Sequence, residues 1–320
     1  MLIKSWVKIK NLLYDGRYLK PVHSNAFVVS VGNITWGGTG KTSLIQRMGS
    51  YLLECGYRLA IVSRGYGRKS SGLRVVSDGK RILEDWENAG EEAYLLAKQL
   101  PGVMIVVAER RAIAFEYLEQ WNPQVILLDD AFQHRRVARD LDLVVVDASE
   151  DLTQQRMIPF GKLREPIQSL SRADAIVLTH VQHSNRSTEQ WIRKNIVTPV
   201  FRADYVSLQK WAGKNIAAFC AIGRPEHFFK MLEETGARVV LSQRFRDHHH
   251  YTEEEIRDLE AGARHAGADA LVTTAKDAVK IPAGITQLPV IVAGVELQLE
   301  NADAFFEFVR VRMLEHLASV

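Results

Sequence analysis

The segment VGNITWGGTGKT at residues 31–42 decides the fold of this chain. Before it, residues 26–31 are apolar and rich in valine, which is typical of a buried parallel strand. After it, residues 43–54 carry apolar side chains at helical spacing. A glycine-rich turn that ends in Gly-Lys-Thr between a strand and a helix predicts a phosphate-binding loop, or P-loop.

In a P-loop, backbone N–H groups and the positive end of the following helix hold the β- and γ-phosphates of a nucleotide. The residues expected to bind the nucleotide are Gly37, Gly38, Thr39, Gly40, Lys41, Thr42 and Ser43. We expect Lys41 to reach the phosphate oxygens and the Thr42 hydroxyl to bind Mg²⁺. Thr35 stands where the consensus motif has its first glycine. The alternative is a glycine-rich turn in which Gly-Lys-Thr occurs by chance.

A second hydrophobic run ends in two carboxylates. Residues 125–128 are aliphatic, and Asp129 and Asp130 follow them directly. Adjacent carboxylates repel each other unless a cation or a hydrogen-bond donor lies nearby, so we expect at least one of them to bind Mg²⁺. The alternative is a solvated turn at the end of a strand, where aspartate is common.

Composition excludes several classes of protein. With 320 residues, 47% hydrophobic and 25% charged, the chain is typical of a globular protein long enough for two domains. Cys55 and Cys220 are far apart and lack metal-binding spacing, so we expect buried, inert thiols rather than disulfides or zinc. A net charge of +3 is too small to indicate nucleic-acid binding. No apolar run reaches the roughly 18 residues of a membrane-spanning helix.

Strand-like and helical segments alternate along the chain. The expected strands lie at 59–63, 103–107, 125–128, 143–146 and 175–178, and the helices between them include 91–100 and 110–121. This alternation predicts an α/β fold, a mostly parallel sheet with helices on both faces and ligands at the carboxyl ends of its strands. The pattern restarts near residue 206, with strands at 216–219, 239–241, 270–272 and 290–292 and helices at 225–235, 253–266 and 302–316. We therefore expect a P-loop domain at 1–205 and a smaller α/β domain at 206–320.

The first thirteen residues form a pattern of their own. Aliphatic and aromatic residues are interleaved with Lys4, Lys8 and Lys10, and no acidic residue precedes Asp15. This pattern predicts a basic amphipathic helix. It either lies on an anionic membrane surface or packs on the domain with its lysines in water.

Several short strings are not required by the fold. They are SRGYG at 63–67, AGEE at 89–92, DDAFQHR at 129–135, PFGKLREP at 159–166, IGRPEHF at 222–228 and DH at 247–248. Together with Gly32 and Asn33, and in this order, they resemble the tetraacyldisaccharide 4′-kinase family of lipid A synthesis. The resemblance implies that ATP, with Mg²⁺, gives its γ-phosphate to the 4′-hydroxyl of a tetraacyldisaccharide 1-phosphate, yielding lipid IV-A. It also implies peripheral attachment to the anionic surface of the bacterial inner membrane, on the cytoplasmic face. No nucleic-acid partner and no obligate protein partner is expected.

The resemblance assigns further residues. Glu91 stands where the family has a proposed catalytic aspartate, and it would accept the proton of the sugar hydroxyl; the alternative is a helix-start carboxylate favoured by the helix dipole. His248 would orient Glu91 or contact substrate, unless it belongs to a polar loop cluster of histidines. Glu165 would assist the metal, or else form a salt bridge with Arg164. With Lys41 and Mg²⁺ neutralising phosphate charge, these groups suffice for phosphoryl transfer.

Two features leave alternatives open. Gln133, His134 and Arg135 either bind sugar or lipid phosphate or make structural hydrogen bonds. Ala131 stands where the family usually has glycine, so a methyl group must fit where the backbone and substrate approach closely.

Two other functions compete with the lipid kinase. The first is a GTPase or a partitioning ATPase. GTPases of this kind recognise guanine with the motif Asn/Thr-Lys-x-Asp, whereas the sequence at 274–277 is TAKD, in which the lysine comes one position later than in the motif. A P-loop kinase or ligase for a small soluble acid is the other, and it would not need the basic amphipathic N-terminus.

Overall fold

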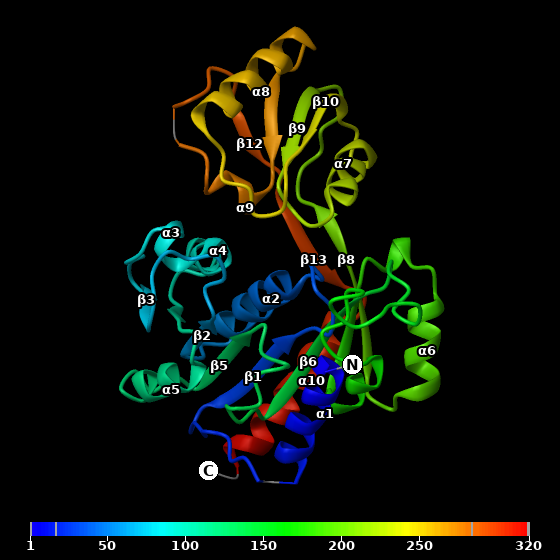
Figure 1. Ribbon diagram of the computed structural model, residues 1–320. Coiled ribbons are helices and arrows are strands. Elements are labelled where there is room, and N and C mark those ends of the chain that lie inside the picture. Colours follow the sequence, from blue (N-terminus) through cyan, green and yellow to red (C-terminus); the bar gives the residue numbers. More distant parts are fainter. Residues whose placement is uncertain (1, 17, 283, 319–320) are drawn as a thin grey trace. The chain divides into compact units, whose positions relative to one another are not determined.

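The computed structural model describes residues 2–16, 18–282 and 284–318, without the side chains of residues 2–8 (Figure 1). The described chain forms two compact units. The larger contains Met1–Asp204 and Leu297–Val320, and the smaller contains Tyr205–Glu296. No helix in these described ranges is both long and apolar enough to cross a membrane.

The larger unit is built on a nine-stranded sheet in the order β13-β8-β7-β6-β1-β5-β2-β4-β3. Its strands are β1 (Phe27–Gly32), β2 (Leu59–Ser63), β3 (Arg74–Asp78), β4 (Met104–Val107), β5 (Val125–Asp129), β6 (Leu141–Asp147), β7 (Ala175–Thr179), β8 (Val200–Ser207) and β13 (Val295–Leu299). Pairing is parallel from β8 to β4, and β3 is antiparallel to β4. Val31 pairs with Asp129, so the P-loop and the acidic pair leave the sheet at neighbouring strand ends.

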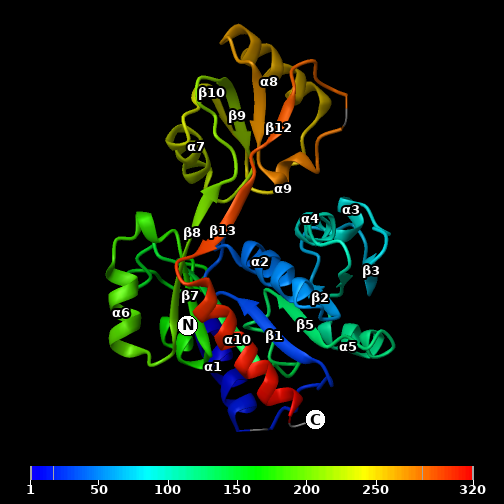
Figure 2. The same cartoon turned by 180° about the vertical axis from the view of Figure 1, so that it is seen from behind.

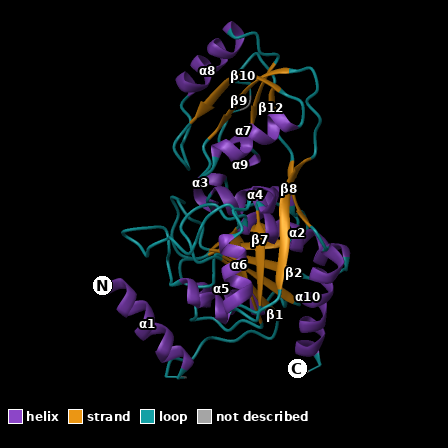
Figure 3. Ribbon diagram, turned by 90° about the vertical axis from the view of Figure 1, so that its right-hand side faces the viewer, coloured by secondary structure: helices purple, strands orange, loops and turns teal. Residues whose placement is uncertain are grey.

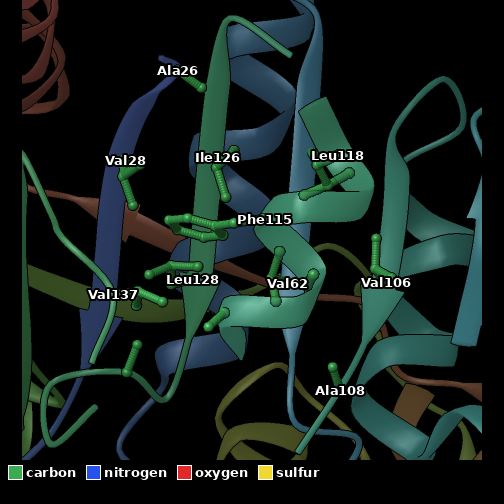
Figure 4. Close-up of a cluster of buried hydrophobic side chains, with 14 of the residues drawn as sticks. Ala26, Val28, Val62, Val106, Ala108, Phe115, Leu118, Ile126, Leu128 and Val137 are labelled. Atoms are coloured by element: carbon green, nitrogen blue, oxygen red, sulfur yellow. The ribbon is translucent and has the colours of Figure 1, made fainter. Parts of the chain in front are cut away.

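Helices cover both faces of this sheet (Figure 3). The helices of the larger unit are α1 (Leu2–Asp15), α2 (Lys41–Glu54), α3 (Trp86–Ala89), α4 (Glu91–Gln99), α5 (Arg111–Glu119), α6 (Ser187–Asn195) and α10 (Ala302–Leu317), with the 3-10 turns η1 (Ile167–Arg172) and η2 (Val181–His183). On the face covered by α5, Phe115 packs against Val28, Ile126 and Leu128 (Figure 4). The prediction of a mostly parallel sheet between helices is confirmed.

The smaller unit repeats the same architecture at reduced size. Its strands β9 (Asn215–Cys220), β10 (Arg238–Arg244), β11 (Ala270–Thr273) and β12 (Val290–Val292) form a parallel sheet in the order β10-β9-β11-β12. The helices are α7 (Pro225–Glu234), α8 (Glu253–His265) and α9 (Ala275–Ala278). Helix α7 and helix α8 contribute to different hydrophobic clusters, because alternate side chains of β9 point to opposite faces of the sheet.

The structure differs from the expectations in three strands, one helix and one cysteine. Strands β3, β8 and β13 were not expected. Helix α10, expected in the smaller domain, belongs to the larger unit (Figure 2). Its aromatic side chains pack there: Phe306 stacks on Tyr51 with ring centroids 3.9 Å apart, and the ring centroids of Phe305 and Phe201 are 5.1 Å apart. Cys220 is buried as expected, and burial raises the pKa of its thiol to about 12. Cys55 is exposed, because it follows the last turn of α2.

Candidate active site

The P-loop leaves β1 and leads directly into α2, and its glycines meet two physical needs. Gly37 and Gly40 have φ values of 116° and 95°, in the left-handed region that favours glycine. At Gly37 and Gly38 a Cβ atom would meet no protein atom within 4 Å. The space beside this backbone is therefore open to a phosphate group, and side chains would narrow it.

A hydrogen-bonded network holds the loop in this shape. Buried Asn33 donates from Nδ2 to Thr39 Oγ1 at 3.2 Å, and its backbone oxygen accepts from Gln133 Nε2 at 2.8 Å. The Thr39 carbonyl accepts from Thr179 Oγ1 at 2.9 Å. Thr39 is 3% exposed, so what it can offer a nucleotide is its backbone rather than its hydroxyl. Thr42 and Ser43 follow in the first turn of α2, where helix N–H groups favour an anion.

Gly32 and Ala131 show how closely the loop and the acidic segment pack. A Cβ at Gly32 would lie 2.5 Å from Phe132 Cβ, so no larger residue fits there. Ala131 is fully buried in the same hydrophobic cluster as Val28 and Leu128. Its methyl group is accommodated in the protein core.

Asp129, the last residue of β5, has a buried carboxylate of which only one oxygen accepts a hydrogen bond. Its Oδ2 accepts from Ser63 Oγ at 2.8 Å, and the residue is 3% exposed. Among the described residues, Oδ1 has no hydrogen-bond partner. Burial, together with the charges of Glu92 and Asp130, raises the Asp129 pKa to about 7. A cation beside Oδ1 would satisfy this oxygen and favour the ionised form, so the residue fits a metal ligand.

Asp130 has a different environment. Its carboxylate accepts two hydrogen bonds from Arg164, of 2.7 and 2.9 Å, and lies 3.6 Å from Lys41 Nζ. Burial opposes its ionisation, but Lys41 and Arg164 outweigh burial and hold the Asp130 pKa well below its usual range. Arg111, at the start of α5, donates to the Asp129 carbonyl at 2.6 Å and the Asp130 carbonyl at 3.2 Å. The turn is thus fixed from two sides, and Asp130 links the P-loop lysine to Arg164.

Glu91 is positioned by a close contact between two glycines. Gly90, with a φ of 87°, precedes α4, and a Cβ there would lie 3.0 Å from the Gly65 backbone. This contact explains why glycine stands at position 65 in the string at 63–67 and at position 90 in the string at 89–92. Glu91 is 5% exposed at the first position of α4, and Glu92 is the neighbour whose charge acts on Asp129. The catalytic role of Glu91 stays a prediction.

Both oxygens of Glu165 are engaged by other side chains, and its expected role toward the metal stays a prediction. Its two oxygens accept from Arg172 at 2.8 and 3.0 Å, and Oε2 also accepts from Asn11 Nδ2 at 3.2 Å. The expected alternative, a salt bridge with Arg164, is wrong, because Arg164 pairs with Asp130 and Arg172 takes its place. Across the described ranges, no three carboxylate, histidine or cysteine side chains gather into a metal-binding cluster.

Gln133 and Arg135 have structural contacts with helix α1. The Gln133 carbonyl accepts from Lys10 Nζ at 2.9 Å. Arg135 donates to the Asn11 carbonyl at 3.1 Å and pairs with Asp15 at 2.7 Å. Both residues therefore make structural contacts, and binding of sugar or lipid phosphate by them stays a prediction.

His248 lies in the smaller unit, after β10. Its φ is 61°, and its Nε2 is 3.4 Å from Lys276 Nζ and 3.9 Å from Asp247 Oδ1. Its expected role toward Glu91 stays a prediction. The string TAKD at 274–277 also lies in this unit, after β11, and therefore not on the sheet that carries the P-loop.

Comparison with known proteins gives one consistent answer. The family described as tetraacyldisaccharide-1-P 4′-kinase matches residues 1–313. This chain belongs to that family. It is 40% identical over 288 residues to a protein named tetraacyldisaccharide 4′-kinase from Chlorobium phaeovibrioides, covering 84% of this chain and 81% of the relative. It is 38% identical over 300 residues to the protein of that name from Desulfotalea psychrophila, covering 88% and 86%.

A solved structure agrees with this family assignment. The crystal structure of LpxK from Aquifex aeolicus in complex with ATP is similar to this chain, with a TM-score of 0.78 and 30% identity, covering 98% of this chain and 96% of that one. As a tetraacyldisaccharide 4′-kinase, the chain transfers the γ-phosphate of ATP to the 4′-hydroxyl of the acylated disaccharide. The GTPase and the soluble-acid kinase are thereby excluded.

Proposed function

We propose that this kinase binds the triphosphate of ATP in the open loop at Gly37–Gly40, with Lys41 neutralising the transferred phosphoryl group. The observation that carries the proposal is the short link from Lys41 Nζ through Asp130 to Arg164, at 3.6 Å and then 2.7 Å. A lysine beside an ion-paired carboxylate is held in place before substrate binds. Phosphoryl transfer depends mostly on positioning and on charge neutralisation, so a lysine that is held in place beside the phosphates favours the reaction.

Asp129 and the Thr42 hydroxyl are the groups we propose to hold Mg²⁺. The buried Asp129 Oδ1 without a hydrogen-bond partner supports this assignment. Magnesium in kinases commonly uses one or two protein oxygens and completes its shell with phosphate oxygens and water, so no larger carboxylate cluster is required. When bound, the ion neutralises charge on the phosphates. Asp130 is then a positioning residue, and Glu165 is a structural one.

We further propose that Glu91 accepts the proton of the 4′-hydroxyl and that His248, from the smaller unit, assists it. Burial of Glu91 at the first position of α4 supports a fixed orientation for its carboxylate. Glu92, whose charge acts on Asp129, is the alternative base.

Attachment to an anionic membrane through α1 is the last part of the proposal. The polar side chains of Lys10 and Asn11 donate hydrogen bonds to other residues of the larger unit. The apolar side chains of Ile9 and Leu12, in contrast, are 57% and 58% exposed. A helix packed in the ordinary way would show the reverse arrangement. Exposed apolar side chains beside basic ones suit the surface of the inner membrane, on whose cytoplasmic face we place the enzyme.

Thermal shift measurements with ATP test the metal assignment. The melting temperature of the wild type should rise with ATP and rise further when Mg²⁺ is added. Asp129→Asn should keep the rise with ATP alone and lose the increment from Mg²⁺. Glu165→Gln is the matched control and should keep both. If Asp129→Asn kept the Mg²⁺ increment, Asp129 would not be the metal ligand.

A further inference from the structure

Arg64 is an exposed arginine that directly follows β2 at the carboxyl edge of the larger sheet. β2 is the neighbour of β5, the strand that ends in Asp129, and it is the second strand from β1, which leads into the P-loop (Figure 1). Parallel α/β sheets bind their ligands along this edge. Arg64 therefore leaves the sheet on the side where the substrates are expected.

The backbone on both sides of Arg64 is held in place. Before it, Ser63 donates from Oγ to Asp129 Oδ2 at 2.8 Å. After it, Gly65 has a φ of 69°, and a Cβ at this glycine would lie 2.8 Å from the Ala89 carbonyl oxygen. Such close packing leaves the turn little freedom. The Arg64 side chain thus extends from a fixed point.

The guanidinium of Arg64 has no hydrogen bond and no ion pair within the part of the chain that the structure describes. Two other arginines at this edge do have partners: Arg111 donates to the Asp129 carbonyl at 2.6 Å, and Arg164 pairs with Asp130 at 2.7 Å. Burial lowers the Arg111 pKa, and the charge of Arg64 adds to this effect while the acidic pair opposes it. An exposed guanidinium that acts on a second one and lacks an anionic partner suits an anion from outside the chain.

The description of the family supplies a candidate anion, because its acceptor is a disaccharide that carries a 1-phosphate. The 4′-hydroxyl of this acceptor must reach the γ-phosphate, which we place at Lys41, and the 1-phosphate is on the other sugar. β2 lies roughly 10 Å from β1, at the usual spacing of strands. This separation suits a phosphate at the far end of the acceptor better than the triphosphate of ATP.

We propose that Arg64 binds the 1-phosphate of the acceptor, with two N–H donors of its guanidinium directed at two phosphate oxygens. A disaccharide without the 1-phosphate leaves this guanidinium without its anion, so the contact selects the phosphorylated acceptor. The inference rests on the proposed binding of the triphosphate in the P-loop, and it adds a residue that recognises the other substrate.

The test compares two acceptors at saturating ATP: the acylated disaccharide 1-phosphate and the same disaccharide without its phosphate. In Arg64→Ala, the ratio of kcat/KM for the first acceptor to that for the second should fall about 10- to 100-fold, because a charged hydrogen-bond partner is lost. Arg64→Lys keeps the charge without the paired geometry, so it should give an intermediate ratio.

Arg81→Ala is the matched control and should keep the wild-type ratio. Arg81 is an exposed arginine in the loop after β3, where its backbone N–H donates to Asp78 Oδ1 at 2.7 Å. Asp78 pairs with Met104, the first residue of β4, so this control lies at the amino edge of the same sheet.

A ratio of two rates measured on one sample does not depend on how much of that sample is folded. A wild-type ratio in Arg64→Ala would overturn the inference. An equal loss with both acceptors would also overturn it, since that is the result expected if Arg64 bound the γ-phosphate of ATP. Lys41→Ala separates these results from a failure of the proposed function. If Lys41→Ala is inactive with both acceptors while Arg64→Ala keeps the wild-type ratio, the P-loop proposal stands and recognition of the 1-phosphate by Arg64 falls.

Discussion

Arg164 and Asp130 form a two-bond ion pair, with Nη1 to Oδ1 at 2.7 Å and Nη2 to Oδ2 at 2.9 Å. The same guanidinium donates from Nη1 to Asn33 Oδ1 at 3.1 Å, so it joins the acidic turn to the residue that supports the P-loop. Lysine cannot form the paired bonds of arginine, although it keeps the charge. The shape of Arg164, beyond its charge, therefore sets the position of Asp130 and Lys41.

Arg164→Lys should lower kcat by about 10²-fold, with a smaller change in the free energy of unfolding than Arg164→Ala causes. Steady-state kinetics of the transfer reaction measure the effect. Lys162→Ala is the matched control, because Lys162 is 56% exposed and pairs with Glu150. Wild-type kcat in Arg164→Lys would show that the paired geometry has no catalytic role.

Glu91→Gln should lower kcat by about 10²–10⁴-fold with little change in KM for ATP, if Glu91 is the general base. Glu91→Asp should retain far more activity. Glu92→Gln removes a charge that acts on Asp129, so its losses should depend on Mg²⁺ concentration, whereas those of Glu91→Gln should not. Equal small losses at both positions would show that the base lies elsewhere, with His248 or Asp130 as the next candidates.

His134 should make the protein less stable in acid. Burial, with the charges of Arg111 and Lys10, lowers the His134 pKa to about 3. Below its unfolded pKa of about 6.5, the unfolded state binds a proton that the folded state does not, so stability falls as pH falls from about 6.5 toward 3. His134→Gln removes this loss. Its melting temperature relative to the wild type should therefore rise by several degrees between pH 7.5 and pH 5. A difference that is constant with pH would show that His134 titrates normally.

Ile9→Ser with Leu12→Ser should weaken binding to vesicles of anionic phospholipid, because both exposed side chains are proposed to enter the interface. KM for the acylated substrate should rise, with a smaller effect on a short-chain, water-soluble analogue. Leu314→Ser with Leu317→Ser is the matched control on α10, where the two side chains are 45% and 44% exposed. Equal vesicle binding by both double variants would contradict attachment through α1.

Much of the fold could be predicted because its signals are local. The P-loop, the buried strands and most helices follow from glycine spacing and apolar periodicity within short windows. β3 escaped detection because it is an edge strand with exposed Arg74 at one end and half-buried Asp78 at the other. The position of α10 depends on Tyr51 and Phe201, which are distant in sequence.

The site was predicted in part for the same reason. Lys41, Thr42 and Asp129 belong to motifs that carry their chemistry in adjacent residues. The partners of the acidic pair, Ser63 and Arg164, lie 66 and 34 residues away, and only folding brings them together. The strings at 63–67 and 159–166 marked both residues without indicating what they contact.

Transfer of labelled γ-phosphate from ATP to the acylated disaccharide 1-phosphate tests the central claim most directly. We expect Lys41→Ala, folded as judged by its melting temperature, to lose about 10³-fold or more in kcat at saturating ATP. Lys80→Ala, which removes an exposed lysine from a turn of the same unit, should transfer phosphate at the wild-type rate. Turnover by Lys41→Ala near that of the wild type would contradict the assignment of residues 31–42 as the phosphate-binding loop of this kinase.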